Sequence, residues 1–272
     1  MIIDAHLHVW SQDVKKYPWN PIGGYIPEKS ASIAEFIRQM DDAFVEKAVL
    51  VQPTPYGWDN SYLLDICREA QERFKAVVLV DPSSDHASES LKILVDNGAC
   101  GLRVNLPLLT LESIRSDTFL NLLNTAQSLS IPVCFQLTPE YFNPISGLFN
   151  QFKGTQFILD HLARPNKGCK PDDENFIQML EFSKNLNVFV KLSGLNYFSN
   201  QSDPYEDTWL LLKAVNDRFT ADHCMWGSDF PFVNKHWSYL GNLNTFKNDL
   251  GFSDPDLAWI LGKTADAIWW GE

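Results

Sequence analysis

The chain has 272 residues, a formal net charge of −12 and 45% hydrophobic residues. This excess of acids argues against sequence-independent binding of nucleic acid, which relies on clustered cations. No apolar run is long enough to span a membrane, and the first residues lack the basic and apolar regions of a signal peptide. The five cysteines are scattered without a CxxC pair, as is typical of free thiols in a reducing compartment. We therefore expect a cytoplasmic protein that acts on a small molecule, with neither nucleic acid nor membrane as partner; no oligomeric state is predicted.

Apolar, β-branched runs recur along the whole chain and predict buried parallel strands. Their starts lie roughly 25 to 45 residues apart, which leaves room for a crossover helix each time. The eight predicted strands are residues 2–6, 47–52, 75–80, 100–105, 131–137, 156–161, 187–193 and 223–229.

Helical patterns occupy the intervals between these strands. Ser32 and Glu35 form a capping-box sequence that predicts a helix over 33–43. Asp203 and Pro204 are typical of a helix start and predict a helix over 205–216. The other expected helices are 62–74, 88–97, 118–129, 140–152, 174–185 and 254–270. Eight alternating units at this length predict a single-domain (β/α)₈ TIM barrel over residues 1–272. A doubly wound open sheet is the weaker alternative, because no glycine-rich fingerprint follows the first strand.

A barrel collects functional side chains at the C-terminal ends of its strands. His6 and His8 are two residues apart at the end of the first strand, so we expect them to project together. Asp229 ends the eighth strand, which neighbours the first in a closed barrel. A carboxylate there suits a general base that takes a proton from water. Together with the two imidazoles, it also suits zinc or manganese.

Further candidates follow other strands. His161 ends an apolar strand and is a third possible imidazole, whereas strand alternation predicts a structural role for Asp160. Arg103 lies inside an apolar strand, where a guanidinium must pair with either a carboxylate ligand or an internal acid. Arg164 and Lys191 are further candidates for binding an anion. Lys191 alternatively acts as an electrophile or pairs with Asp160 or Asp229.

Two aromatic loops are expected above this polar ring. Residues 11–30, rich in Pro, Tyr and Trp, form a long insertion after the first strand, which a barrel would place over its active face. Trp10 and Trp58 would supply an aromatic wall for a flat ring or a sugar.

The motifs in order resemble the amidohydrolase superfamily. They are Asp4-Ala-His-Leu-His-Val-Trp10, Gly101-Leu-Arg-Val-Asn105, Leu159-Asp-His-Leu-Ala-Arg-Pro165, Val190-Lys-Leu-Ser-Gly194 and Met225-Trp-Gly-Ser-Asp-Phe-Pro231. More narrowly they resemble the amidohydrolase-related branch that contains 2-pyrone-4,6-dicarboxylate lactonase and the sugar-acid lactonases. The resemblance implies a (β/α)₈ barrel in which Asp229 activates water. It implies that His6, His8 and His161 bind one divalent ion, zinc or manganese, or contact the substrate directly in a metal-free reaction.

The sequence departs from the wider superfamily where a second ion is often bound. Arg103 or Asn105, and Gln136, stand where many members place a metal-binding His or Lys, so a binuclear site is not expected. The leading hypothesis is a lactonase for a sugar-acid or pyrone-type lactone, with Arg103, Gln136, Arg164 and Lys191 as substrate ligands. The alternatives are a metal-dependent, non-oxidative decarboxylase of an aromatic or unsaturated acid, and a non-catalytic ligand-binding barrel.

Overall fold

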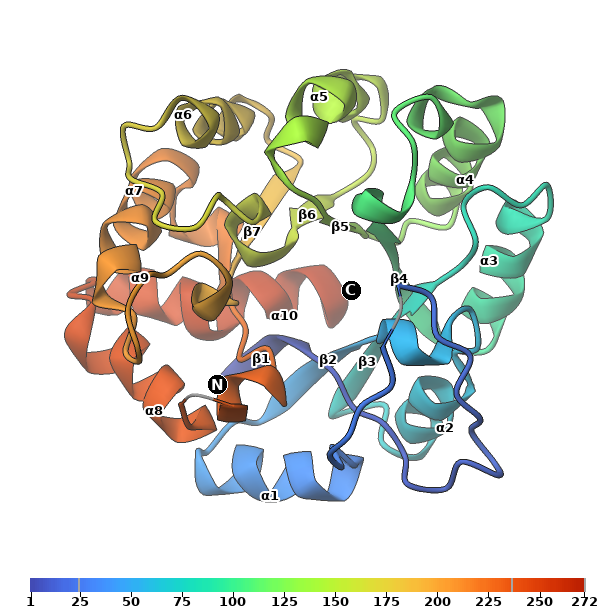
Figure 1. The fold of residues 1–272 in the computed structure, drawn as a ribbon, viewed down its shortest axis with the longest axis horizontal. Helices are drawn as coiled ribbons and strands as arrows, with labels where there is room; N and C mark the ends of the chain where they lie inside the picture. The colour runs from blue at the N-terminus through green and yellow to red at the C-terminus, as the bar shows by residue number, and fades with distance from the viewer. Residues whose placement is uncertain (24, 236, 272) are drawn as a thin grey trace.

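The protein is described by a computed structural model that covers residues 1–272 except 24, 236 and 272. Eight parallel strands form one sheet in which each strand pairs with the next along the chain (Figure 1). The strands are β1 Ile3–Leu7, β2 Lys47–Val51, β3 Phe74–Leu79, β4 Ala99–Asn105, β5 Val133–Gln136, β6 Phe157–Leu159, β7 Val188–Leu192 and β8 Cys224–Trp226.

The sheet closes on itself just beyond the short strand β8. Leu7 forms a parallel bridge with Phe230. The amide of Asp229 donates to the carbonyl of His6 at 2.8 Å, and the amide of His8 donates to the carbonyl of Phe230 at 2.7 Å. These bonds join the first strand to the loop after the last. The predicted (β/α)₈ barrel is therefore confirmed, and the open doubly wound sheet is wrong.

Helices surround the strands and bury their outer faces (Figure 1). They are α1 Ile33–Asp42, α2 Ser61–Glu69, α3 Ala87–Asp96, α4 Asp117–Ser128, α5 Phe142–Gln151, α6 Glu174–Leu180, α7 Trp209–Phe219, α8 Tyr239–Asn244, α9 Asp254–Ala258 and α10 Thr264–Trp269. The capping box at Ser32 and Glu35 is present at the start of α1, as predicted. No helix among the described residues is long and apolar enough to cross a membrane.

Two helix predictions differ from the structure. Helix α7 begins at Trp209 instead of residue 205, because Tyr205 has a φ of +61°. This left-handed backbone cannot continue an α-helix, and a 3₁₀ turn over Glu206–Thr208 precedes α7 instead. The predicted final helix consists of α9, a π-helical segment over Trp259–Lys263, and α10.

A second apolar cluster fills the interior of the barrel. It includes Ile3 and Ala5 of β1 and Met225 of β8, and Ala265 and Trp269 of α10 close it from below. Leu7 belongs instead to the outer core, because the pairing of β1 with β2 shifts register between Asp4 and Leu7. This irregularity re-aims the residues that follow it, as β-bulges near active sites do.

Candidate active site

The first-strand histidines meet above the apolar interior, as their spacing predicts. Nε2 of His6 lies 3.2 Å from Nε2 of His8, and both side chains are buried. Nδ1 of His8 lies 2.8 Å from the carbonyl oxygen of Val51. A carbonyl only accepts, so the proton of neutral His8 resides on Nδ1 and its Nε2 lone pair faces His6. Burial lowers the pKa of His8 to about 3, so this imidazole is neutral at physiological pH.

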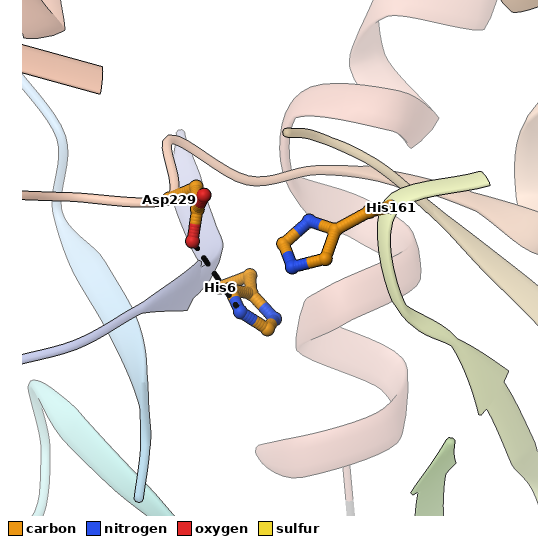
Figure 2. A group of neighbouring side chains, drawn as sticks. All are labelled: His6, His161 and Asp229. Atoms are coloured by element: carbon orange, nitrogen blue, oxygen red, sulfur yellow. Dashed lines mark ion pairs between the residues drawn. The ribbon is translucent and has the colours of Figure 1, made fainter. Parts of the chain in front are cut away.

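Asp229 completes this cluster from the loop after β8. Its Oδ1 lies 3.7 Å from Nε2 of His6 (Figure 2). The same oxygen lies 3.7 Å from Nε2 of His8. Tyr197 donates its hydroxyl to Oδ2 at 2.6 Å. Oδ1 is buried and has no hydrogen-bond partner among the described residues. Burial raises the pKa of Asp229 to about 7, so the group exchanges a proton near neutral pH.

His161 approaches the same point from the end of β6. Potential ligand atoms of His6, His161 and Asp229 all lie within 4.8 Å of one another (Figure 2). His161 has a φ of +55° within a run of left-handed residues that ends at Arg164. Its Nδ1 bonds the hydroxyl of Ser193 at 2.8 Å, which fixes the ring. The left-handed turn therefore brings His161 inward, although it does not continue the strand.

Asp160 is the centre of a buried ion network beneath the imidazoles. Its Oδ1 lies 3.1 Å from Nζ of Lys191 and 3.2 Å from Nδ1 of His6, and its Oδ2 lies 3.1 Å from Nε of Arg103. Burial opposes its ionisation, but Lys191, His6 and Arg103 outweigh burial and hold the pKa of Asp160 well below its usual range. Asp160 lies two residues after Ile158, which faces the barrel interior, and these ion pairs fit the structural role predicted for Asp160.

An open cavity lies above this cluster. It has a volume of about 130 Å³ and includes Arg103, Gln136 and Arg164 in its lining. His8, Tyr25, Pro53, Thr54, Asn105, His161, Tyr197 and Phe232 complete the wall. Tyr25 comes from the insertion over 11–30, so that loop reaches the active face as expected.

Three of the predicted ligands do not line this cavity. Lys191 is fully buried, pairs with Asp160 and lies 5.6 Å from the ring centre of Trp269. Its charge is thus neutralised below the cavity floor. Trp10 is 4% exposed and donates its indole N–H to the carbonyl of Lys29 at 2.7 Å, so it packs behind the wall. Trp58 lines a neighbouring cavity that shares Arg103 and Asn105 with this one.

Sequence reasoning missed Tyr197, Tyr25 and Phe232. Tyr197 contacts Asp229 directly, and the guanidinium of Arg164 lies 4.6 Å from its ring centre. Three residues before it, Gly194 has a φ of +63°, and the turn it forms brings Tyr197 back over the site. A glycine directly after a predicted strand was the available signal for such a turn.

The donor atoms of His6, His8 and Asp229 fit one divalent ion. Their separations of 3.2, 3.7 and 3.7 Å leave a point about 2.0–2.2 Å from all three, the range of zinc–nitrogen and zinc–oxygen bonds. Two imidazoles and a carboxylate are a common donor set for such an ion. The buried, unpartnered Oδ1 of Asp229 agrees with this fit.

Comparison with known proteins agrees with the fold and the motifs. The chain is 27% identical over 265 residues to 4-sulfomuconolactone hydrolase of Hydrogenophaga intermedia, covering 95% of this chain and 85% of that protein. It is 26% identical over 245 residues to 2-pyrone-4,6-dicarboxylate hydrolase of Comamonas testosteroni, covering 85% and 77%. A crystal structure from Acinetobacter baumannii with citric acid bound matches with a TM-score of 0.86 at 22% identity, covering 98% of both chains, which shows a shared fold. The Amidohydrolase family model matches residues 3–269. The chain therefore belongs to the amidohydrolase family.

Proposed function

We propose that the protein is a lactonase that opens a sugar-acid or pyrone-type lactone by attack of water. The observation that carries the proposal is the buried Oδ1 of Asp229, which has no hydrogen-bond partner among the described residues and faces His6 and His8. The two lactone hydrolases to which the chain is similar support the same reaction class.

Asp229 is the residue suited to take the proton of the attacking water. The hydroxyl of Tyr197 holds Oδ2, so Oδ1 is left to accept the proton. The water oxygen bonds to the lactone carbonyl carbon, and its proton moves to Asp229. The ring carbon–oxygen bond then breaks, and the proton returns from Asp229 to the leaving oxygen. The product is the open-chain acid, and the enzyme is regenerated.

Cationic and amide groups in the cavity wall are placed to hold the substrate. Arg103 binds Asp160 through Nε and lines the cavity. Arg164 and Gln136 line the same cavity. These donors suit the carbonyl, carboxylate or hydroxyl groups of an acidic or hydroxylated lactone.

His6, His8 and Asp229 would hold a divalent ion, zinc or manganese, with His161 beside them. Such an ion supplies polarisation of a carbonyl and a lowered pKa for water. In a reaction without metal, His161 is the imidazole best placed to donate to the carbonyl, because it lines the cavity and the hydroxyl of Ser193 orients it.

The proposal is tested by screening ring opening of sugar-acid and pyrone lactones with a pH indicator. We expect Asp229→Asn to lower kcat by at least about 100-fold, the lower range for a general base. Asp217→Asn, at an exposed position of α7, is the matched control and should retain full activity. Each reaction is run with and without a strong chelator, followed by addition of zinc or manganese.

Two results would contradict the proposal. Unchanged turnover of a confirmed lactone by Asp229→Asn would remove its assigned base. Release of carbon dioxide from an unsaturated acid, without ring opening of any lactone, would favour a decarboxylase.

A further inference from the structure

A second cavity adjoins the one above the imidazoles. It has a volume of about 360 Å³ and lies between the ends of β3 and β4 and the insertion after β1. Its wall is mostly apolar. The lining side chains that matter here are Ile22, Trp58, Leu79, Val80, Leu108 and Leu109.

Arg103 and Asn105 line both cavities and therefore mark their boundary. Both project from the C-terminal end of β4 and are nearly completely buried. Oδ1 of Asn105 is buried without a hydrogen-bond partner among the described residues. A buried acceptor in this state is costly unless a bound molecule supplies a donor. Asn105 is therefore suited to accept a hydrogen bond from a bound ligand.

The volumes of the two cavities indicate that each holds a different part of the substrate. Pockets for small molecules commonly measure about 300–1,000 Å³. The cavity above the imidazoles, at about 130 Å³, falls below that range, whereas the neighbour, at about 360 Å³, lies within it. The reacting ring therefore fits above His8 and His161, and the neighbouring cavity has room for the remainder of a larger substrate.

The residues that line the second cavity determine which chemical group of the substrate it can hold. Besides the apolar side chains, the wall contains the carboxylate of Asp81, which accepts from the amide and the hydroxyl of Ser83. A second carboxylate on the substrate would meet Asp81 and a largely apolar surface, and Arg103, the cation at the boundary of this cavity, is already paired with Asp160, so the lost hydration would be poorly compensated. A hydrocarbon group would be buried against Trp58 and the leucines, and removal of its apolar surface from water would favour binding.

We propose that the preferred substrate is a lactone bearing an apolar substituent that occupies this second cavity, referred to below as the Trp58 cavity. The inference rests on the proposed lactonase function and narrows its substrate class. It predicts that a hydrophobic arm, and not a second acidic group, improves binding.

Three probes that differ at one ring position test this inference. They are 2-pyrone, 6-pentyl-2-pyrone and 2-pyrone-6-carboxylic acid. Binding is measured by titration calorimetry with the inactive Asp229→Asn variant, and turnover by loss of the ring's ultraviolet absorbance with the native enzyme. We expect the pentyl compound to bind at least about tenfold more tightly than 2-pyrone, since even one well-placed methylene can contribute that much. The carboxylate should bind more weakly than the pentyl compound.

A matched pair of variants locates the effect. Leu108 and Leu111 are exposed leucines of the loop after β4, 44% and 50% exposed, and only Leu108 lines the Trp58 cavity. Leu108→Asp should reduce the preference for the pentyl compound over 2-pyrone to near unity. Leu111→Asp should preserve that preference.

The outcomes separate this inference from the proposed function. Preferential binding of the pentyl compound without turnover of any lactone supports the Trp58 cavity and contradicts the lactonase. Turnover with no preference for the pentyl group, or with a preference for the carboxylate, overturns the inference and leaves the lactonase standing. Absence of binding by all three compounds overturns the inference. An equal loss of preference in both leucine variants also overturns it.

Discussion

At the scale of single residues, Gly194 shows how closely the site is packed. It follows Ser193, whose hydroxyl fixes the ring of His161, and it has a φ of +63°. A Cβ at this position would lie 2.6 Å from Nδ1 of His161 and 2.7 Å from Cδ2 of Tyr197. Both neighbours belong to the site, so any side chain at position 194 would displace the imidazole or the tyrosine.

Gly194→Ala should therefore abolish most activity while leaving the fold intact. We expect a fall in kcat of at least about 100-fold, because a displacement of about 1 Å is enough to cost that much. The control is Gly147→Ala on α5, where an added Cβ meets nothing within 4 Å. That change should retain activity and slightly raise the free energy of unfolding, since alanine favours a helix interior. Equal activity of the two variants would contradict the assigned position of His161.

A buried ion network beneath the site joins Lys191, Asp160 and Arg103. Lys191 and Asp160 are fully buried and 3.1 Å apart. A buried ion pair contributes little net stability, but loss of one partner leaves a charge without compensation. The network orients His6 from below and keeps Arg103 at the cavity wall.

At the scale of elements, helix α1 illustrates how a local sequence signal sets a boundary. The side chain of Ser32 accepts from the amide of Glu35, and the carboxylate of Glu35 accepts from the amide of Ser32 at 2.7 Å. Phe36 and Met40 bury the other face of the helix in the outer core. The hydroxyl of Ser30 also donates to this carboxylate and, with Ser32, lowers the pKa of Glu35.

Ser32→Ala should lower the free energy of unfolding by about 0.5–2 kcal/mol at neutral pH, as expected for loss of an N-cap. Because the folded-state pKa of Glu35 is lowered, its contribution is present above the unfolded pKa and is lost as the pH falls through the folded pKa. The difference in free energy of unfolding between the native protein and the Ser32→Ala variant should thus become smaller at acidic pH. Urea unfolding at two pH values measures it, with Ser146→Ala on α5 as control. A loss that does not change with pH would contradict this account of Glu35.

At the scale of the whole molecule, barrel closure creates the candidate metal site. His6 and His8 come from the first strand, and Asp229 comes from the loop after the last, 221 positions beyond His8. The site therefore exists only in the folded chain. An ion that binds there binds the native state alone and must raise its apparent stability.

Zinc should accordingly raise the Tm of the native protein. At free zinc 100 times the Kd, the stabilisation is about 2.7 kcal/mol, which corresponds to a rise of several degrees. His8→Ala should remove most of that rise, whereas His86→Ala should preserve it, because His86 is exposed at the N-cap of α3 and lies outside the site. A rise of the same size in both variants would place the bound zinc elsewhere.

Much of this molecule follows from sequence patterns. Apolar runs and helix caps predict the order of strands and helices, because burial and capping act on residues close together in the chain. The HxH pair, His161 and Asp229 are predictable as members of one candidate site, since the ends of parallel strands meet at one face of a barrel. The amidohydrolase resemblance found in the motifs is confirmed by the family match over residues 3–269.

Only the tertiary structure decided which neighbours these residues meet. Strict alternation along β1 would place His6 and His8 opposite Ile3 and Ala5, and the register shift between Asp4 and Leu7 brings them inside. Asp160 is the centre of an ion network because Arg103 of β4 and Lys191 of β7, the strand next to β6, reach it. Tyr197 reached Asp229 through a left-handed turn. Bulges, left-handed turns and ion pairs between residues far apart in the sequence depend on packing of the whole chain, and a local sequence pattern does not predict them.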